Sequence, residues 1–261
     1  MRSVTKWFAK LQNPRHADLE IADLIDDLVI ANHILFQQGV LDSFGHVSAR
    51  HPTNSNHFLM SRAMAPGLVQ PPDILSFDLD GVALKDTTQS LYMERFIHSE
   101  LYKARGDVNA IVHSHSPTVI PFSITQTELR PVFHRASFLS RGVPVFEIRE
   151  VAGAKNNMLV NDAKRGEALA QALGEKNVAL MRGHGNVVVA SRLRLAVSRA
   201  IETEVNAKLQ LQAIMIGGPI NYLSAEEAET FEADLARTKP SDARGADRVW
   251  EGLKRLLQSR A

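Results

Sequence analysis

A short apolar run that ends in two histidines constrains this chain more than any other feature of its sequence. Residues 108–112 have the composition of a buried β-strand, and His113 and His115 follow directly. Side chains two positions apart on a strand point to the same face. The two imidazoles are therefore expected to project together from the end of the strand, an arrangement that suits a metal site.

A carboxylate and a third imidazole extend this pair into a candidate metal site. Glu94 lies upstream on a predicted helix, and His184 stands between Gly183 and Gly185 at a predicted strand end. The glycines allow the tight backbone path that would aim this ring. The chain has no cysteine, which excludes thiolate ligands and disulfides. Three imidazoles and one carboxylate suit one divalent ion per subunit, with Mn²⁺ or Zn²⁺ expected and Fe²⁺ also compatible.

Composition excludes several classes of partner. The 261 residues are 44% hydrophobic, enough for one large domain, alone or with a helical appendage. The net charge is +1 with both signs mixed along the chain, which gives no indication of nucleic-acid binding or polybasic membrane contact. Neither residues 1–14 nor any other run has the apolar length of a signal peptide or membrane span. We therefore expect a cytoplasmic protein.

Hydrophobic periodicity predicts a mixed α/β fold with several hairpins rather than a regular βαβ series. An Asp-Gly turn at 80–81 predicts one of these hairpins, and Gly39 is expected to end the first helix. The expected helices cover 18–36, 91–105, 162–173, 192–215 and 250–257, and the expected strands cover 46–50, 57–60, 74–78, 82–84, 108–112, 145–148, 178–181 and 187–190.

The last part of the chain differs in composition from the rest. After Pro219 it becomes charged and rich in Ala and Glu, with a connector predicted at 238–245. Residues 218–261 are expected to form a helical extension that packs on the core or on a neighbouring subunit.

Four motifs, in this order, resemble those of the class II aldolase/adducin family. They read Phe44-Gly-His-Val-Ser-Ala-Arg50, Glu94-Arg-Phe-Ile-His98, Val112-His-Ser-His115 and Arg182-Gly-His-Gly185. The resemblance implies a three-layer α/β/α sandwich with a mixed, largely antiparallel central sheet, and a catalytic domain over residues 1–217. It also implies a divalent metal on His113, His115 and His184, with Glu94 as acid/base or fourth ligand, and a homotetramer with active sites between subunits.

The chain departs from the sugar-phosphate aldolases of this family at the positions that bind the substrate phosphate. His46 replaces an asparagine, Arg62 stands where a small hydroxyl residue is usual, and Tyr92 begins the pair that replaces two serines. His134 or Arg135 takes the place of a catalytic tyrosine. Because a guanidinium can hold a carboxylate through two hydrogen bonds, the pattern favours a carboxylate substrate over a phosphate.

Residues 58–66 and 73–81 resemble the branch of metal-dependent, non-oxidative decarboxylases of hydroxylated aromatic or heteroaromatic carboxylic acids. In such an enzyme the metal would chelate a hydroxyl and a carboxylate of the substrate and stabilise the carbanion left when CO₂ departs. Glu94, His46 or His98 would then protonate the ring carbon. The predicted catalytic residues are Glu94, His46, Arg62 and His98, and the predicted substrate-binding residues are Ser48, Arg62, Tyr92, His134 and Arg135.

Simpler roles stay open for several of these residues. Arg62 can form a surface ion pair, His46 can be a buried turn histidine, and His98 can be a core histidine bonded to a neighbour. His134 and Arg135 can be solvated loop residues. For the whole protein, the alternative is an aldolase-type lyase or epimerase acting on a sugar phosphate. A non-catalytic interaction module, as in adducin-like heads, is a third interpretation.

Overall fold

The computed structural model describes residues 16–237 and 245–259, so residues 1–14 and nearly all of the predicted connector lie outside the described residues. Its centre is a seven-stranded sheet with the strand order β3-β2-β1-β4-β7-β6-β5. All neighbouring strands are antiparallel except β5 and β6, which confirms the mixed, largely antiparallel sheet. The strands are β1 (His46–Arg50), β2 (His57–Ser61), β3 (Ile74–Asp78), β4 (Ala110–Ser114), β5 (Val145–Phe146), β6 (Val178–Met181) and β7 (Gly185–Ala190).

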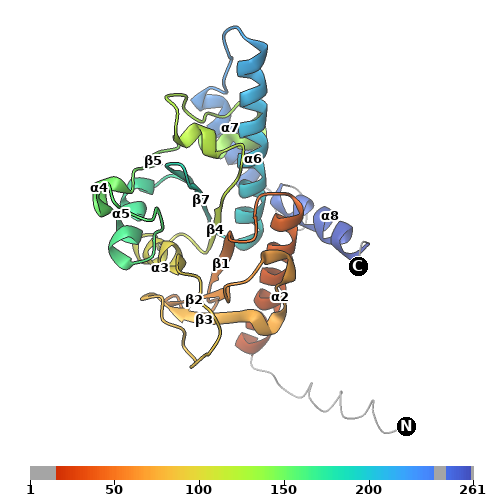
Figure 1. The fold of residues 1–261 in the computed structure, drawn as a ribbon. Coiled ribbons are helices and arrows are strands. Elements are labelled where there is room, and N and C mark those ends of the chain that lie inside the picture. The colour runs from red at the N-terminus through yellow and green to blue at the C-terminus, as the bar shows by residue number, and fades with distance from the viewer. Residues whose placement is uncertain (1–15, 238–244, 260–261) are drawn as a thin grey trace.

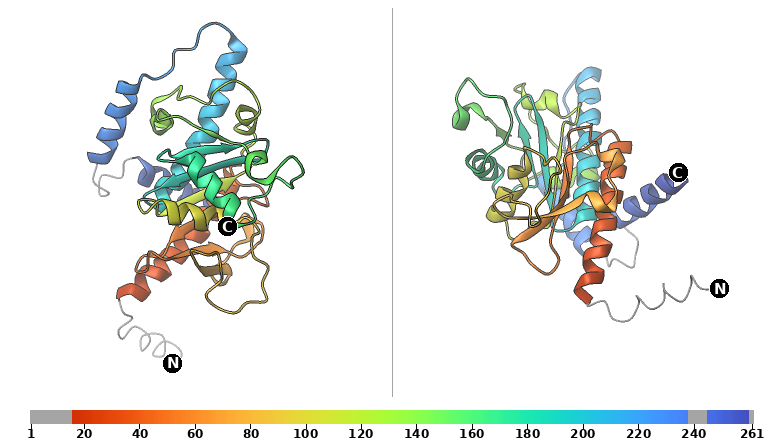
Figure 2. Two further views of the ribbon diagram at one scale, coloured as in Figure 1. Left: turned by 90° about the vertical axis from the view of Figure 1, so that its left-hand side faces the viewer. Right: turned by 60° about the horizontal axis from the view of Figure 1, so that its bottom comes forward.

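Helices cover both faces of this sheet, which confirms the predicted three-layer α/β/α sandwich. Figure 1 shows α2 (His16–Gln37), α6 (Leu193–Ile216) and α8 (Ala246–Gln258) on one side, and α3 (Arg95–Ala104), α4 (Arg149–Ala152) and α5 (Ala163–Leu173) on the other. The views in Figure 2 show that α6 extends beyond the sheet before the chain turns back toward α7 (Ala225–Arg237). Four short 3₁₀ helices complete the described elements: η2 (Pro66–Leu68), η3 (Pro71–Asp73), η4 (Ile120–Ser123) and η5 (His134–Leu139).

Two apolar cores, one on each face of the sheet, decide which strand residues face which helices. Val47 on β1 and Val112 on β4 belong to the core beneath α2 and α6. Ile111 on β4 belongs to the core beneath α3 and α5. Since side chains alternate along a strand, His46 and His113 lie on the α3 side, and these two residues are direct cross-strand partners.

Several element boundaries differ from the sequence expectations. Strand β4 covers Ala110–Ser114 rather than 108–112, so His113 lies within the strand instead of after it. The second helix begins at Arg95 rather than at residue 91, so Glu94 precedes the helix instead of lying on its face one turn before His98. The expected strand at 82–84 is reduced to a single bridge between Phe77 and Ala83. The expected strand at 145–148 ends at Phe146, because Ile148 already has helical backbone angles at the start of α4.

The C-terminal helices pack on the described core. Trp250 of α8 is 1% exposed and belongs to the core that α2 and α6 cover, and the guanidinium of Arg194 lies 5.1 Å from the centre of its ring. Helix α7 contacts η5. Among residues 16–237 and 245–259, none of the helices is both long enough and apolar enough to cross a bilayer.

Candidate metal centre

The structure brings together the four side chains that the sequence proposes as metal ligands. Glu94 stands just before α3, His113 lies on β4, His115 follows that strand, and His184 lies in the turn between β6 and β7. One potential ligand atom from each residue lies within 4.8 Å of all the others. Oε2 of Glu94 is 3.6 Å from Nε2 of His113 and 3.4 Å from Nε2 of His184.

Each of the three imidazoles is held by its other nitrogen. Nδ1 of His113 donates to the carbonyl of Asn186 at 3.2 Å, and Nδ1 of His184 donates to the carbonyl of Met158 at 2.9 Å. Nδ1 of His115 donates to the Asp42 carboxylate at 2.9 Å. These acceptors fix the tautomer of each ring, so every Nε2 presents a bare lone pair to the centre of the cluster.

This set of donor atoms fits a cation. Nε2 of His184 and Nε2 of His115 lie 3.1 Å apart, and two bare lone pairs at that distance repel one another unless a positive charge lies near both. Nε2 of His113 is buried and has no hydrogen-bond partner among the described residues, and a buried polar atom normally has one. A divalent ion would satisfy all three nitrogens and the carboxylate at once.

Glu94 is fixed in the same way as the histidines. Its Oε1 accepts the backbone N–H of Val160 at 2.9 Å, which leaves Oε2 directed to the cluster. Burial alone would raise the pKa of Glu94, but its interaction with His113 and His184 outweighs burial and holds that pKa well below its ordinary value. Burial lowers the pKa of His113, whereas in His184 the nearby Glu94 carboxylate outweighs burial and raises the pKa.

Two glycines explain how the turn between β6 and β7 places His184. Gly183 has a φ of +63°, which favours glycine over residues with a side chain. A Cβ at Gly185 would lie 2.1 Å from the carbonyl oxygen of Ser114, so β7 can approach β4 this closely only without a side chain at that position.

Further polar side chains lie between the metal centre and α3. The ring centres of His46 and His113 are 5.0 Å apart, and those of His46 and Tyr92 are 4.5 Å apart. His98 and Ser48 follow His46 in a buried hydrogen-bond chain. Burial lowers the pKa of His98 to about 3, so this ring is neutral. Both of its nitrogens are engaged and it is 0% exposed, so His98 does not reach a substrate directly.

The structure does not bring the remaining predicted residues into the cluster. Arg62 is one-third exposed, and its Nε donates to Asp73 at 2.7 Å. His134 and Arg135 lie in η5, which adjoins the core on the opposite face of the sheet from His46. Arg135 forms an ion pair with Glu202 of α6.

Sequence reasoning missed the groups that hold the ligands in place. Asp42 belongs to an Asp-Ser-Phe-Gly turn, a pattern that indicates side-chain-to-backbone hydrogen bonds and could have identified it. Met158 and Asn186 contribute backbone carbonyls, for which the sequence carries no signal.

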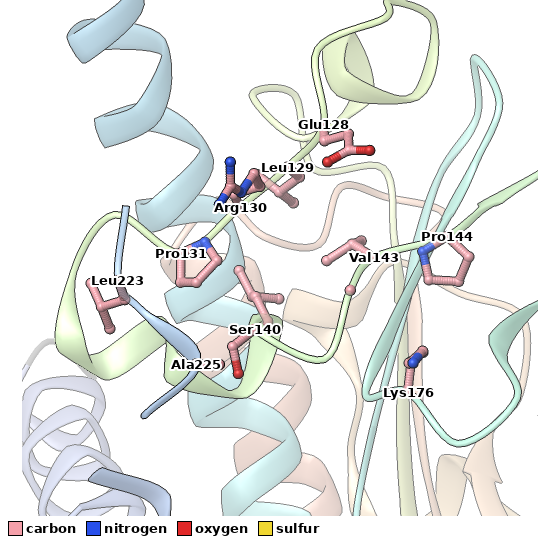
Figure 3. A pocket seen from close by; sticks show the side chains of 12 residues that line it. Glu128, Leu129, Arg130, Pro131, Ser140, Val143, Pro144, Lys176, Leu223 and Ala225 are labelled. Carbon is pink, nitrogen blue, oxygen red and sulfur yellow. The ribbon is translucent and has the colours of Figure 1, made fainter. Parts of the chain in front are cut away.

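A separate cavity contains none of the four ligands. It lies among residues 128–131, the loop after η5 and residues 223–225, with Arg130 and Lys176 on its wall (Figure 3). We therefore place the candidate site at the histidine cluster.

The fold and the cluster define an α/β protein with a candidate divalent-metal centre at a strand end. The chain belongs to the family described as Class II Aldolase and Adducin N-terminal domain, whose model matches residues 26–211. The family resemblance inferred from the motifs is confirmed.

Relatives of this chain include proteins named as decarboxylases. It is 33% identical over 234 residues to decarboxylase tropJ of Talaromyces stipitatus, an alignment that covers 84% of this chain and 88% of the relative. It is 29% identical over 211 residues to a 3,4-dihydroxyphthalate decarboxylase of Arthrobacter keyseri, with 75% and 81% covered. The solved structure of L-fuculose 1-phosphate aldolase from Glaciozyma antarctica PI12 has a TM-score of 0.75 at 22% identity, covers 97% of this chain and 98% of its own, and so shows the shared fold.

Proposed function

We propose that the protein is a divalent-metal-dependent, non-oxidative decarboxylase of a hydroxylated aromatic or heteroaromatic carboxylic acid. The observation that carries the metal dependence in this proposal is the convergence of four acceptor atoms, which a divalent cation would satisfy together. The decarboxylase names of two relatives support the same class of reaction.

The ligands would be Nε2 of His113, His115 and His184 together with Oε2 of Glu94. When bound, Mn²⁺ or Zn²⁺ supplies Lewis-acid stabilisation of negative charge on substrate oxygens. The hydrogen bond from Val160 holds the Glu94 carboxylate toward the cluster, which supports a ligand role for this residue.

Decarboxylation breaks the bond between the ring and the carboxylate, leaves the electron pair on the ring carbon, and requires a proton there. His98 is excluded as the direct donor because both of its nitrogens are bonded within the core. Glu94 and His46 are the candidates that border the cluster, Glu94 through Oε2 and His46 through its contact with His113.

Arg62 would orient a carboxylate of the substrate. Only its Nε is bonded, to Asp73, and the two terminal nitrogens have no hydrogen-bond partner among the described residues. They can therefore donate side by side to a carboxylate. We expect Arg62→Ala to raise KM about ten- to hundredfold, as for the loss of a charged hydrogen bond, whereas Arg237→Ala, at an exposed position on α7, serves as control. Wild-type turnover and affinity in Arg62→Ala would show that the anchor role is wrong.

We also propose a homotetramer with active sites between subunits. In one subunit His134 and Arg135 lie across the sheet from His46, so they can contribute to a metal centre only in a neighbouring subunit. Light scattering coupled to size-exclusion chromatography would test the assembly, and a fully active monomer would contradict it.

The second candidate is an aldolase-type lyase or epimerase acting on a sugar phosphate, because such chemistry can use the same four ligands. To separate the two, Mn²⁺- and Zn²⁺-loaded protein is incubated with a panel of hydroxylated aromatic dicarboxylates, and CO₂ release is measured with His113→Ala as control. Metal-dependent release that the variant lacks would support the decarboxylase. Release of dihydroxyacetone phosphate from a sugar phosphate, without CO₂ from any panel member, would support the aldolase. Absence of affinity for either metal would favour the interaction module.

A further inference from the structure

A buried hydrogen-bond chain leads from the metal centre into the space between the sheet and α3. Nδ1 of His46 lies 2.6 Å from Nε2 of His98, and Nδ1 of His98 lies 2.6 Å from Oγ of Ser48. Oγ of Ser48 lies 2.8 Å from the hydroxyl of Tyr102. All four side chains are at most 1% exposed. When both rings are neutral the four side chains carry four hydrogens, and the three contacts of the chain hold only three of them, so one hydrogen is left over.

The far end of the chain fixes the direction of its hydrogen bonds. Among the described residues, the Tyr102 hydroxyl bonds only to Ser48, and burial raises the pKa of this hydroxyl, which keeps its hydrogen in place. Leaving that hydrogen unpaired at a buried position is unfavourable. Tyr102 therefore donates to Ser48, and Ser48 donates its single hydrogen to Nδ1 of His98.

The directions of these hydrogen bonds also determine which nitrogen of His46 carries its hydrogen. His98 is neutral and accepts on Nδ1, so it carries its hydrogen on Nε2 and donates to Nδ1 of His46. The opposite direction would leave over the hydrogen of Tyr102, and a chain in which Ser48 accepts from both sides would leave over the hydrogen of Ser48, both farther along the chain from the metal centre. The direction taken here leaves the extra hydrogen on His46 instead, beside the ligand His113, where a substrate can accept it. His46 must then carry its own hydrogen on Nε2, the nitrogen that bonds to none of the described residues.

Arg50 holds Tyr102, the residue at the far end of the chain. Its guanidinium lies 4.7 Å from the centre of the Tyr102 ring, and it donates to the backbone carbonyls of Tyr102 at 2.9 Å and Val108 at 3.0 Å. Arg50 thus fixes the position of the Tyr102 ring.

We infer that this chain locks His46 as a neutral hydrogen-bond donor, through Nε2–H, to an anionic oxygen of the substrate, with His98, Ser48 and Tyr102 as positioning residues. The inference rests on the proposed function for the carboxylate nature of that substrate. His46 lies against His113, so a substrate held at the metal centre comes within its reach. A neutral imidazole can stabilise charge on an oxygen without adding a second cation beside the metal.

Nitrogen-15 NMR of the histidine rings tests this inference in the zinc-loaded full-length protein, with His46 assigned by His46→Gln. We expect hydrogen on Nε2 and a bare Nδ1 at His46. Tyr102→Phe should keep this tautomer, because Ser48 still donates to the chain. Ser48→Ala combined with Tyr102→Phe should populate both tautomers, because nothing then fixes the direction. Tyr92→Phe removes a hydroxyl from the tyrosine that contacts His46 outside the chain, and this matched control should keep the wild-type tautomer.

Hydrogen on Nδ1 of His46, or on both of its nitrogens, in the wild-type protein would overturn the inference whether or not the variants fold. Added salicylate, a hydroxyaromatic carboxylate, should shift the Nε2–H signal, and an unchanged signal at the highest concentration would refute the donor role. The tautomer of His46 is measured without turnover, so a wrong inference about His46 is distinguishable from a wrong proposal of decarboxylase activity, which the CO₂ assay tests.

Discussion

The carboxylate of Asp42 decides which nitrogen of His115 is free to bind a metal. Its Oδ1 accepts the backbone N–H groups of Phe44 at 2.8 Å and Gly45 at 2.9 Å, and its Oδ2 accepts Nδ1–H of His115. In Asp42→Asn the amide oxygen can keep the two backbone hydrogen bonds, which turns the NH₂ group toward His115. Two donors then face one another, and His115 avoids the conflict only by moving its hydrogen to Nε2, the atom that would bind the metal.

The size of the effect follows from the exposure of this contact. Loss of an outer hydrogen bond to a metal-bound histidine typically lowers metal affinity about 10- to 100-fold. The Asp42 side chain is 46% exposed, so water can partly replace the lost acceptor. We therefore expect Asp42→Asn to weaken Zn²⁺ binding about tenfold, which corresponds to about 1.4 kcal/mol.

Competition with a chromophoric zinc chelator measures this change directly. The matched control is Asp80→Asn, which alters an exposed carboxylate bonded to Lys103 and should leave zinc affinity unchanged. The reasoning would be refuted if Asp42→Asn bound zinc as tightly as the wild type, or if both variants weakened binding equally.

Two further predictions concern stability, measured by urea denaturation. Gly185→Ala places a Cβ 2.1 Å from the Ser114 carbonyl oxygen and should lower the free energy of unfolding by about 3 kcal/mol. The control Gly252→Ala on α8, where a Cβ meets open space, should raise the free energy of unfolding by up to about 1 kcal/mol. Equal stability of the two variants would contradict the close approach of β7 to β4. Burial lowers the pKa of His98 from 6.5 to about 3, so the stability that its neutral ring contributes is complete above pH 6.5 and is lost as the pH falls toward 3. Over this range the free energy of unfolding of the wild type should fall by up to about 1.4 kcal/mol per pH unit more than that of His98→Gln. Parallel pH profiles would contradict this assignment.

Periodicity predicted the interiors of elements better than their ends. The long helices α2 and α6 and the strands β1, β4 and β7 each contribute apolar side chains to the two cores, and their periodic spacing is visible in the sequence. The start of α3 is set instead by Glu94, whose side chain is held by Val160 and the histidine cluster. Such contacts depend on the tertiary structure, so the local sequence pattern predicted a helix that begins four residues too early.

In the candidate site, too, features set by local geometry were predictable from the sequence and features set by tertiary contacts were not. The spacing of His113 and His115 at the end of a strand was sufficient to predict that their rings project together, because side chains two apart on extended backbone point to one face. The bonds of His98 to His46 and Ser48 depended on how α3 packs against β1, and a single sequence does not specify that packing. The support of His184 by the carbonyl of Met158 depended on a backbone group that any residue could provide.

The loop between α4 and α5 holds two ligands from different parts of the chain. The carbonyl of Met158 accepts from His184, and the N–H of Val160 donates to Glu94. Met158 has a φ of 61°, which residues other than glycine rarely adopt, so the loop keeps this path only while its partners hold it. Loop order and ion binding are then linked reciprocally: whatever free energy an ion gains from an ordered loop, the loop gains from the ion. Amide hydrogen exchange in residues 158–160 would report metal occupancy without any substrate.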